Sequence, residues 1–325
     1  MPQTVKLALL DDYQNMTSKI GDWDRLRKRG VEITVFREPF RSIEDAAAKL
    51  KPFDAFQMLR ERTAFPRALI EKLPNLKCIF MTGARATSLD DKAATERGIP
   101  ISNTPGGGSN ASTAELTWAL LMMCARDLAK SERLMRSGGW HDGVKGMVVL
   151  EGKRLGVIGL GKLGTKVSKL AQAFGMNVIA WSPNLTPEKC QEAGVTYASK
   201  DELFSTADII TVHVVLSQRS RGLVGRDELA RMKPTAYLVN TARGPIVDED
   251  ALLEALTQKK IAGAGIDVFS VEPLPVDHPF RKLDNMVITP HLGYATVENF
   301  ENHYVQMVDC IDVWTRTGEA PKRLA

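Results

Sequence analysis

A glycine-rich turn between an apolar strand and a helix constrains the fold of this chain more than any other feature. Residues 155–158 form a short apolar run typical of a buried strand, and residues 159–164 then read Gly-Leu-Gly-Lys-Leu-Gly. A helical pattern continues from this turn to Phe174, and a second strand is expected at Asn177–Trp181. Strand, Gly-x-Gly-x-x-Gly turn and helix together indicate the first βαβ unit of a dinucleotide-binding domain.

Each glycine of this turn meets a different steric requirement. Gly159 permits the tight turn, Gly161 lets the backbone approach a pyrophosphate, and Gly164 lets the helix pack closely on the strand. The helix N-terminus offers free N–H groups to the phosphates. A tight turn without a ligand is the alternative, and the strand and helix on either side argue against it. A phosphate-loop NTPase is excluded because Thr165-Lys166 follows Gly164, not Lys and then Ser or Thr.

Short apolar runs alternate with helical stretches along nearly the whole chain. This alternation predicts an α/β protein with doubly wound parallel sheets, and 325 residues suggest two domains. The strands expected before the glycine turn are Val5–Leu10, Val31–Phe36, Asp54–Leu59 and Lys77–Met81. The later ones are Arg154–Gly159, Asn177–Trp181, Ile209–His213, Ala236–Asn240, Gly263–Val268 and Met286–Thr289.

A glycine-rich connector at residues 104–108 separates the two series of strands. One long helix is expected after it, up to about Ser137, and a final helix over roughly Val297–Arg316. A terminal helix of this kind can return to the first domain. We therefore expect two chain crossings between the domains, and a cleft with a hinge.

The end of the second strand of the βαβ unit bears on the choice of cofactor. NAD-binding domains place an acidic residue there for the ribose hydroxyls, but Ser182 stands at this position and no carboxylate occurs before Glu188. Ser182, Asn184 and Thr186 could hydrogen-bond a 2′-phosphate, or they could simply form a capping turn. No arginine lies in this stretch to clamp a phosphate. The sequence favours NADP slightly over NAD.

Four chemically suited side chains follow late strands: Arg243, Asp267, Glu272 and His291. Ligands of open α/β sheets bind outside the carboxyl ends of the strands, so these side chains can converge on one site. Singly, each could be a surface ion pair, a loop cap or a histidine held by the backbone. Arg243 offers a planar charged fork for a carboxylate and a carbonyl oxygen, and His291 beside Glu272 could deliver a proton near neutral pH.

The ordered set of motifs resembles the D-isomer-specific 2-hydroxyacid dehydrogenase family, which includes phosphoglycerate dehydrogenase and glyoxylate/hydroxypyruvate reductase. The motifs are Gly-x-Gly-x-x-Gly at 159–164, Asn-Thr-Ala-Arg-Gly at 240–244, Asp-Val-Phe-x-x-Glu-Pro at 267–273 and Pro-His-x-Gly at 290–293. The resemblance covers nearly the whole chain. It implies a Rossmann cofactor domain at residues 103–290, inserted in a flavodoxin-like substrate-binding domain formed by residues 1–102 and 291–325.

The resemblance also implies an activity, the reversible reduction of a small 2-oxo acid such as glyoxylate or hydroxypyruvate to the D-2-hydroxy acid with NAD(P)H. Arg243 would bind the oxo acid, His291 would exchange the proton, and Glu272 would assist it. Thr82 and Gly83 match the loop that binds the substrate carboxylate, and Asp267 would contact the nicotinamide carboxamide. The cofactor contacts so implied are Gly159, Gly161, Lys162, Leu163, Gly164, Ser182, Val214, Thr241, Ala242, Asp267 and Gly293.

Departures from the family pattern concern the substrate. The carboxylate-binding loop usually continues Gly-x-Asp, whereas here it reads Gly83-Ala84-Arg85. We hypothesise that Arg60 or Arg85 recognises a second anionic group of the substrate; a solvated arginine, or one paired with Glu61, is the alternative. Aromatic side chains that could also shape the pocket, across a dimer interface, are Trp140, His141 and Tyr294.

Composition excludes several other classes of protein. The 43 Lys and Arg against 39 Asp and Glu are spread along the chain, without the dense basic block that would bind nucleic acid. Four widely separated cysteines suit neither a metal site nor a disulfide framework, so we expect no metal and a reduced, cytoplasmic location. No apolar stretch is long enough for a membrane span.

The remaining alternatives share this fold. One is a non-catalytic NAD(H)-sensing corepressor, and the other is a formate or phosphite dehydrogenase. The long helix after the connector resembles the dimerisation arm of the family, which implies a homodimer.

Overall fold

The computed structural model describes residues 4–83, 86–104, 111–144 and 146–321. The chain folds into two compact units, the second of which interrupts the first in sequence. Unit 1 comprises Met1–Gly108 and Thr296–Ala325, and unit 2 comprises Ser109–Ala295. The boundaries expected at 102/103 and 290/291 fall a few residues before these.

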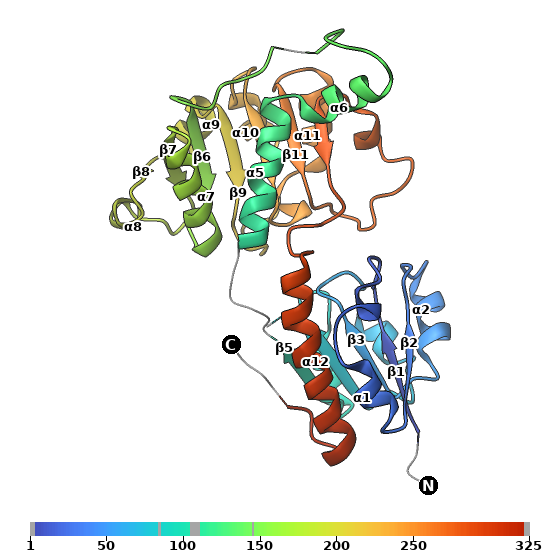
Figure 1. Cartoon of the computed structure of the whole chain (residues 1–325). Coiled ribbons are helices and arrows are strands. Elements are labelled where there is room, and N and C mark those ends of the chain that lie inside the picture. The colour runs from blue at the N-terminus through green and yellow to red at the C-terminus, as the bar shows by residue number, and fades with distance from the viewer. Residues whose placement is uncertain (1–3, 84–85, 105–110, 145, 322–325) are drawn as a thin grey trace. The chain divides into compact units, whose positions relative to one another are not determined.

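Unit 1 is built on a parallel sheet with the strand order β2-β1-β3-β4-β5 (Figure 1). The strands are β1 (Val5–Leu9), β2 (Val31–Val35), β3 (Ala55–Met58), β4 (Cys78–Thr82) and β5 (Ile101–Thr104). The helical segments are η1 (Met16–Ser18), α1 (Trp23–Arg27), α2 (Ile43–Leu50), α3 (Arg67–Ile70), α4 (Asp91–Glu96) and α12 (Val297–Thr317). This order is that of flavodoxin-like sheets, so the predicted fold of the first domain is confirmed.

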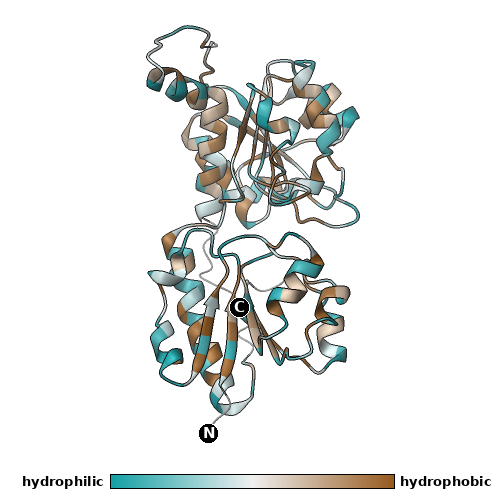
Figure 2. Cartoon of the chain, turned by 90° about the vertical axis from the view of Figure 1, so that its right-hand side faces the viewer, coloured by the Kyte–Doolittle hydropathy of each residue, from teal (hydrophilic) through white to brown (hydrophobic). Residues whose placement is uncertain are grey.

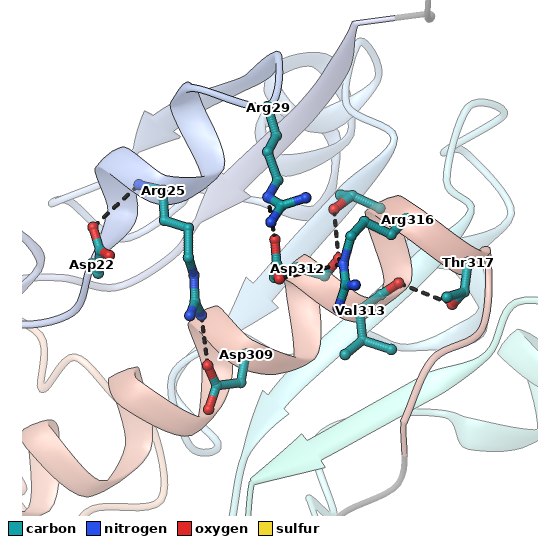
Figure 3. Close-up of polar contacts among 9 residues, drawn as sticks. Asp22, Arg25, Arg29, Asp309, Asp312, Val313, Arg316 and Thr317 are labelled. Atoms are coloured by element: carbon teal, nitrogen blue, oxygen red, sulfur yellow. Dashed lines mark hydrogen bonds and ion pairs between the residues drawn. The ribbon is translucent and has the colours of Figure 1, made fainter.

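Helix α12 joins the C-terminal segment to the N-terminal part of unit 1. Arg25 Nη2 lies 2.5 Å from Asp309 Oδ1, and Arg29 Nε lies 2.7 Å from Asp312 Oδ1 (Figure 3). The same helix places Trp314 edge-on against Phe80 of β4, with ring centroids 5.7 Å apart. Because these contacts join the two ends of the sequence, unit 1 is complete only when both segments are present.

Unit 2 is built on a parallel sheet with the strand order β12-β11-β10-β9-β6-β7-β8. The strands are β6 (Arg154–Ile158), β7 (Asn177–Trp181), β8 (Thr196–Tyr197), β9 (Ile209–Val212), β10 (Tyr237–Asn240), β11 (Gly263–Ile266) and β12 (Met286–Ile288). Counted from β6, this is the Rossmann order with one further strand at the edge. The predicted doubly wound α/β architecture is therefore confirmed for both units.

The helices of unit 2 correct one prediction. The single long helix expected up to Ser137 is two helices, α5 (Ala111–Ala125) and α6 (Leu128–Arg136). Asp127 between them has a φ of 46°, a left-handed conformation that interrupts the helical hydrogen bonds and that Asp tolerates better than most residues. The other helical segments are α7 (Lys162–Ala173), α8 (Pro187–Glu192), α9 (Lys200–Thr206), α10 (Arg226–Arg231), η2 (Gly244–Ile246), α11 (Glu249–Thr257) and η3 (Pro279–Lys282).

The apolar core of each unit follows its strands, where Figure 2 shows the hydrophobic colouring concentrated. In unit 2 the small residues of β11 let α5 pack directly against the sheet. A Cβ at Gly265 would lie 3.1 Å from Leu120 Cβ of α5. Within the described residues, no helix is both long and apolar enough to cross a membrane.

Candidate active site

The glycine-rich turn joins β6 to α7, and the environment of its glycines differs. Gly159 has a φ of 97°, and a Cβ there would lie 2.9 Å from the carbonyl carbon of His213. A Cβ at Gly164 would overlap the carbonyl oxygen of Gly159. A Cβ at Gly161, by contrast, would meet nothing within 4 Å. Two glycines therefore serve close packing, and the space at Gly161 is left open beside the N-terminus of α7.

A pocket of about 430 Å³ opens beside this turn. It is lined by the turn itself, by residues that follow β7, and by the loop that follows β9. Its polar and charged side chains are Ser182, Asn184, Lys189, His213, Ser217, Arg219 and Ser220. The open space at Gly161, the free N–H groups at the start of α7 and a pocket of this size fit the pyrophosphate and adenosine of a dinucleotide.

The predicted cofactor residues are distributed around this turn and the neighbouring strand ends. Val214 lines the pocket, Lys162 begins α7 with an exposed side chain, and Leu163 is half-buried. Thr241 is buried, and its Oγ1 lies 2.8 Å from Thr117 Oγ1 of α5. The Thr241 side chain therefore joins the end of β10 to α5.

Arg243 follows β10 in a turn that its neighbours hold in place. Asn240 receives a hydrogen bond from the Ala242 amide and donates one to the Arg243 carbonyl, both at 3.0 Å. Arg243 Nη1 donates to the Ala242 carbonyl at 2.7 Å. A Cβ at Gly244 would overlap the backbone of Phe269, so glycine is required directly after the arginine. The motif around Arg243 thus fixes the position of a permanently charged guanidinium at a strand end.

His291 and Glu272 form a close pair near the ends of β12 and β11. The distance from His291 Nδ1 to Glu272 Oε2 is 2.6 Å, and both side chains are about one-fifth exposed, at 20% and 24%. The other carboxylate oxygen of Glu272 accepts a hydrogen bond from the Phe269 amide at 2.9 Å. An ionised carboxylate only accepts hydrogen bonds, so this contact assigns a ring proton to Nδ1 of His291.

Asp267 is fully buried and holds the loop that carries His291. Its carboxylate accepts hydrogen bonds from Thr289 Oγ1 at 2.6 Å, from the Leu292 amide at 2.7 Å and from the Gly293 amide at 2.9 Å. Burial raises the pKa of Asp267, and these hydrogen bonds oppose the shift by stabilising the carboxylate. The His291 ring also lies edge-on to Tyr294, with centroids 6.1 Å apart. Asp267 therefore positions the histidine loop.

In unit 1, Thr82 and Gly83 lie at the end of β4, where Gly83 has a φ of 95°. The Gly83 amide donates to the Thr104 carbonyl at 2.6 Å, and Thr82 Oγ1 accepts from the Arg60 amide at 2.8 Å. A Cβ at Gly83 would overlap the guanidinium of Arg60, so this side chain lies directly over the loop. Arg85 lies outside the described residues.

Two further predicted residues have a different setting. Trp140 is 69% exposed, and its ring lies edge-on to that of His141, with centroids 5.5 Å apart.

His213 was not predicted from the sequence, but it lines the pocket beside the glycine turn. Its Nε2 lies 2.9 Å from Thr211 Oγ1. Burial lowers the pKa of His213 to about 3, so its ring is neutral at physiological pH.

Arg219 and Lys189 are the two positively charged residues that line the pocket, and neither was predicted from the sequence. Arg219 belongs to the loop after β9, far along the chain from the strand end examined for an arginine. The signal that could have found it is the strand order, because β9 returns to lie beside β6. Among the described residues, no group of three or more His, Cys, Asp or Glu side chains could hold a metal ion.

Comparison with known proteins gives consistent relatives. Residues 118–293 match the family model described as "D-isomer specific 2-hydroxyacid dehydrogenase, NAD binding domain". The chain is 38% identical over 302 residues to D-3-phosphoglycerate dehydrogenase of Archaeoglobus fulgidus, covering 93% of this chain and 56% of that protein. It is 39% identical over 272 residues to hydroxypyruvate reductase of Thermotoga maritima, covering 82% of this chain and 87% of the relative.

A solved structure agrees with these sequence matches. The phosphoglycerate oxidoreductase of Vibrio cholerae superposes with a TM-score of 0.90 at 31% identity, covering 96% of this chain and 99% of that one. The chain spans only about half the length of some curated relatives, such as the one from A. fulgidus. The family description names NAD binding and a 2-hydroxyacid dehydrogenase, and the relatives are named as a dehydrogenase, a reductase and an oxidoreductase. The chain belongs to the D-isomer specific 2-hydroxyacid dehydrogenase family.

Proposed function

We propose that this protein catalyses the reversible reduction of a small 2-oxo acid, such as glyoxylate or hydroxypyruvate, to the D-2-hydroxy acid with NAD(P)H. The observation that carries this proposal is the 2.6 Å contact between His291 Nδ1 and Glu272 Oε2. Arg243, Glu272 and His291 follow β10, β11 and β12, which are neighbours in a parallel sheet. Their side chains therefore belong to one edge of that sheet, where ligands of such sheets bind.

The residues divide the chemistry among them. Arg243 binds the substrate carboxylate and polarises the oxo group with its charged fork. When bound, the dihydronicotinamide supplies the hydride that adds to the oxo carbon. His291 donates the proton from Nε2 to the oxygen that gains negative charge as the hydroxyl forms. Glu272, already on Nδ1, stabilises the imidazolium from which that proton leaves, and in the oxidation direction each step runs in reverse.

The substrate side of the proposal uses unit 1. Thr82 and Gly83 supply the frame of a carboxylate-binding loop, and the Gly83 amide already donates to Thr104. Arg60, whose guanidinium lies over Gly83, is the candidate for a second anionic group of the substrate.

The cofactor is NAD(H) or NADP(H), with NADP slightly favoured. Ser182 lines the pocket where an acidic residue would bind ribose hydroxyls, and the described residues that line this pocket include no carboxylate. Without that charge, a 2′-phosphate meets no electrostatic repulsion.

A homodimer and a cytoplasmic location are part of the same proposal. Apolar side chains stand exposed on α6 and on the segment that follows it: Leu128, Met135, Trp140, Met147 and Val149. A homodimer in which α6 and the segment after it contact the same elements of a second copy would bury these side chains. The four cysteines, all within the described residues, are thiols rather than disulfides, which is compatible with a reducing compartment.

A steady-state screen of 2-oxo acids, each run with NADH and NADPH, tests the proposal. Turnover of glyoxylate or hydroxypyruvate is the expected result. A non-catalytic NAD(H)-sensing corepressor would bind the cofactor without turnover, and a formate or phosphite dehydrogenase would instead reduce the oxidised cofactor with formate or phosphite. Either of those outcomes would overturn the proposal.

A further inference from the structure

Two cations line the dinucleotide pocket without any role in the reaction proposed above. Lys189 lies in α8, after β7, and Arg219 lies in the loop after β9. Both side chains are exposed. The described residues that line the pocket include neither Asp nor Glu, so two positive charges face this space without an opposing carboxylate. An electrostatic environment of this kind favours an anion with more than one negative charge.

The strand order explains how residues so far apart in sequence reach one pocket. β6 lies between β7 and β9, with Ile158 opposite Trp181 on one side and Val212 on the other. The segments that follow β7 and β9 therefore flank the glycine turn that follows β6. Ser182 is the first residue after β7, so the hydroxyl at the ribose position and both cations belong to the same pocket.

We propose that Arg219 and Lys189, together with Ser182, bind the 2′-phosphate of NADP(H). This inference rests on the proposed dinucleotide cofactor and assigns the residues that select its phosphorylated form. A phosphate monoester carries about 1.5 to 2 negative charges at pH 7, which two cations neutralise. Arg219 provides a planar fork for two phosphate oxygens, Lys189 a compact point charge, and Ser182 a hydroxyl donor. Arg219 supplies the clamp that the stretch after β7 lacks.

Binding of nucleotide fragments by calorimetry tests this site without turnover. The two probes are adenosine 2′,5′-bisphosphate and ADP, of which only the first has the 2′-phosphate. The wild-type chain should bind the bisphosphate more tightly. Arg219→Glu should weaken bisphosphate binding by roughly 10- to 100-fold, as expected for losing a charge-assisted contact, and should change ADP binding by less than about threefold. Lys189→Gln should weaken bisphosphate binding in the same direction by a smaller factor.

Arg221→Glu is the matched control, because it makes the same charge change in the same loop. Arg221 is exposed but does not line the pocket. Equal losses in Arg219→Glu and Arg221→Glu would mean that only the net charge matters, and they would overturn the assignment. Equal affinity of the wild-type chain for both probes would also overturn it. Binding of neither probe would refute the dinucleotide site itself, whereas discrimination without turnover of any 2-oxo acid would refute only the proposed reaction.

Discussion

Replacing Gly161 with alanine should weaken cofactor binding without unfolding unit 2, whereas the same change at Gly164 should destabilise the unit. Both glycines belong to one turn, but their surroundings differ. A Cβ at Gly161 would meet no atom within 4 Å, and one at Gly164 would overlap the Gly159 carbonyl oxygen. The pair therefore separates a glycine required by a ligand from a glycine required by packing.

The expected effect at Gly161 follows from its position as the residue that caps α7. Its φ of −83° and ψ of −165° suit alanine. Alanine caps a helix less well than glycine, by up to about 1 kcal/mol, but it restricts the unfolded chain by about 0.4–1 kcal/mol in compensation. The free energy of unfolding should change little. The added methyl group would occupy the space that a pyrophosphate approaches, so the backbone N–H groups of the turn could no longer all reach the phosphate oxygens. The loss of one hydrogen bond to a charged phosphate weakens binding by roughly 10- to 100-fold.

The expected effect at Gly164 is mainly on stability. The added Cβ would overlap a backbone oxygen and lie 3.1 Å from the Gly159 carbonyl carbon, so the turn and the helix must move apart. Overpacking of this kind costs about 1–3 kcal/mol, and the better helix propensity of alanine returns up to about 1 kcal/mol. A net loss of about 1–2 kcal/mol would lower the Tm by roughly 2–8 °C for a unit of this size.

Fluorescence titration with NADH and urea unfolding of each variant measure the two effects separately. The reasoning about Gly161 would be refuted by an NADH Kd within twofold of the wild-type value. It would equally be refuted by a loss of stability in Gly161→Ala as large as that in Gly164→Ala, since that would place both glycines in the packing.

Three further predictions concern the proposed chemistry and the buried histidines. His291→Ala should lower kcat by about 10²- to 10⁴-fold and Glu272→Gln by about 10- to 100-fold, while the NADH Kd stays unchanged. Arg243→Lys should lower kcat/KM for the oxo acid by on the order of 100-fold, because lysine lacks the planar fork; an unchanged kcat/KM in steady-state assays would contradict this. Burial lowers the pKa of His213 to about 3 and, with Arg60 nearby, that of His303 to about 4, both from 6.5. Unfolding therefore takes up protons below pH 6.5, so each histidine should remove about 1.4 kcal/mol of stability per pH unit as the pH falls towards its folded pKa. Urea unfolding between pH 7.5 and pH 5 measures this slope, and a slope unchanged in His303→Gln would contradict it.

The sequence pattern was sufficient to predict ten strands because parallel strands buried on both faces read as continuous apolar runs. It missed β5 (Ile101–Thr104), which is mostly polar, and β8 (Thr196–Tyr197), which is a short exposed strand at the edge of its sheet. The break between α5 and α6 was not predictable in the same way. Residues 111–136 keep a helical pattern, and the left-handed turn at Asp127 is a choice of backbone conformation that no proline or glycine marks. The structure therefore has two helices where periodicity predicts one.

The candidate catalytic residues were predictable one by one, since each follows a strand in a recognisable motif. Their local contacts were not. Asp267 is predicted to contact the nicotinamide carboxamide, and the structure shows in addition that its carboxylate accepts three hydrogen bonds from the segment around His291. Thr82 and Gly83 are predicted to belong to the loop that binds the substrate carboxylate, and the structure adds a hydrogen bond from the Gly83 amide to the Thr104 carbonyl. Both contacts join segments that are distant in sequence, and hydrogen bonding over such distances leaves no periodic pattern to read.

Arg219 was not predicted as a residue of the dinucleotide pocket because of the order of the strands in the sheet. The residues that follow β7 are the expected neighbours of the cofactor ribose, because consecutive elements of a βαβ unit are adjacent in space. In this sheet the chain passes through β8 and α9 before β9 pairs with the other side of β6. The loop after β9 thereby reaches the same pocket as Ser182, although Arg219 is far along the chain. The preference for NAD or NADP therefore cannot be inferred from the residues after β7 alone. The strand order is also needed, because it identifies the loop after β9 as the second segment beside the glycine turn.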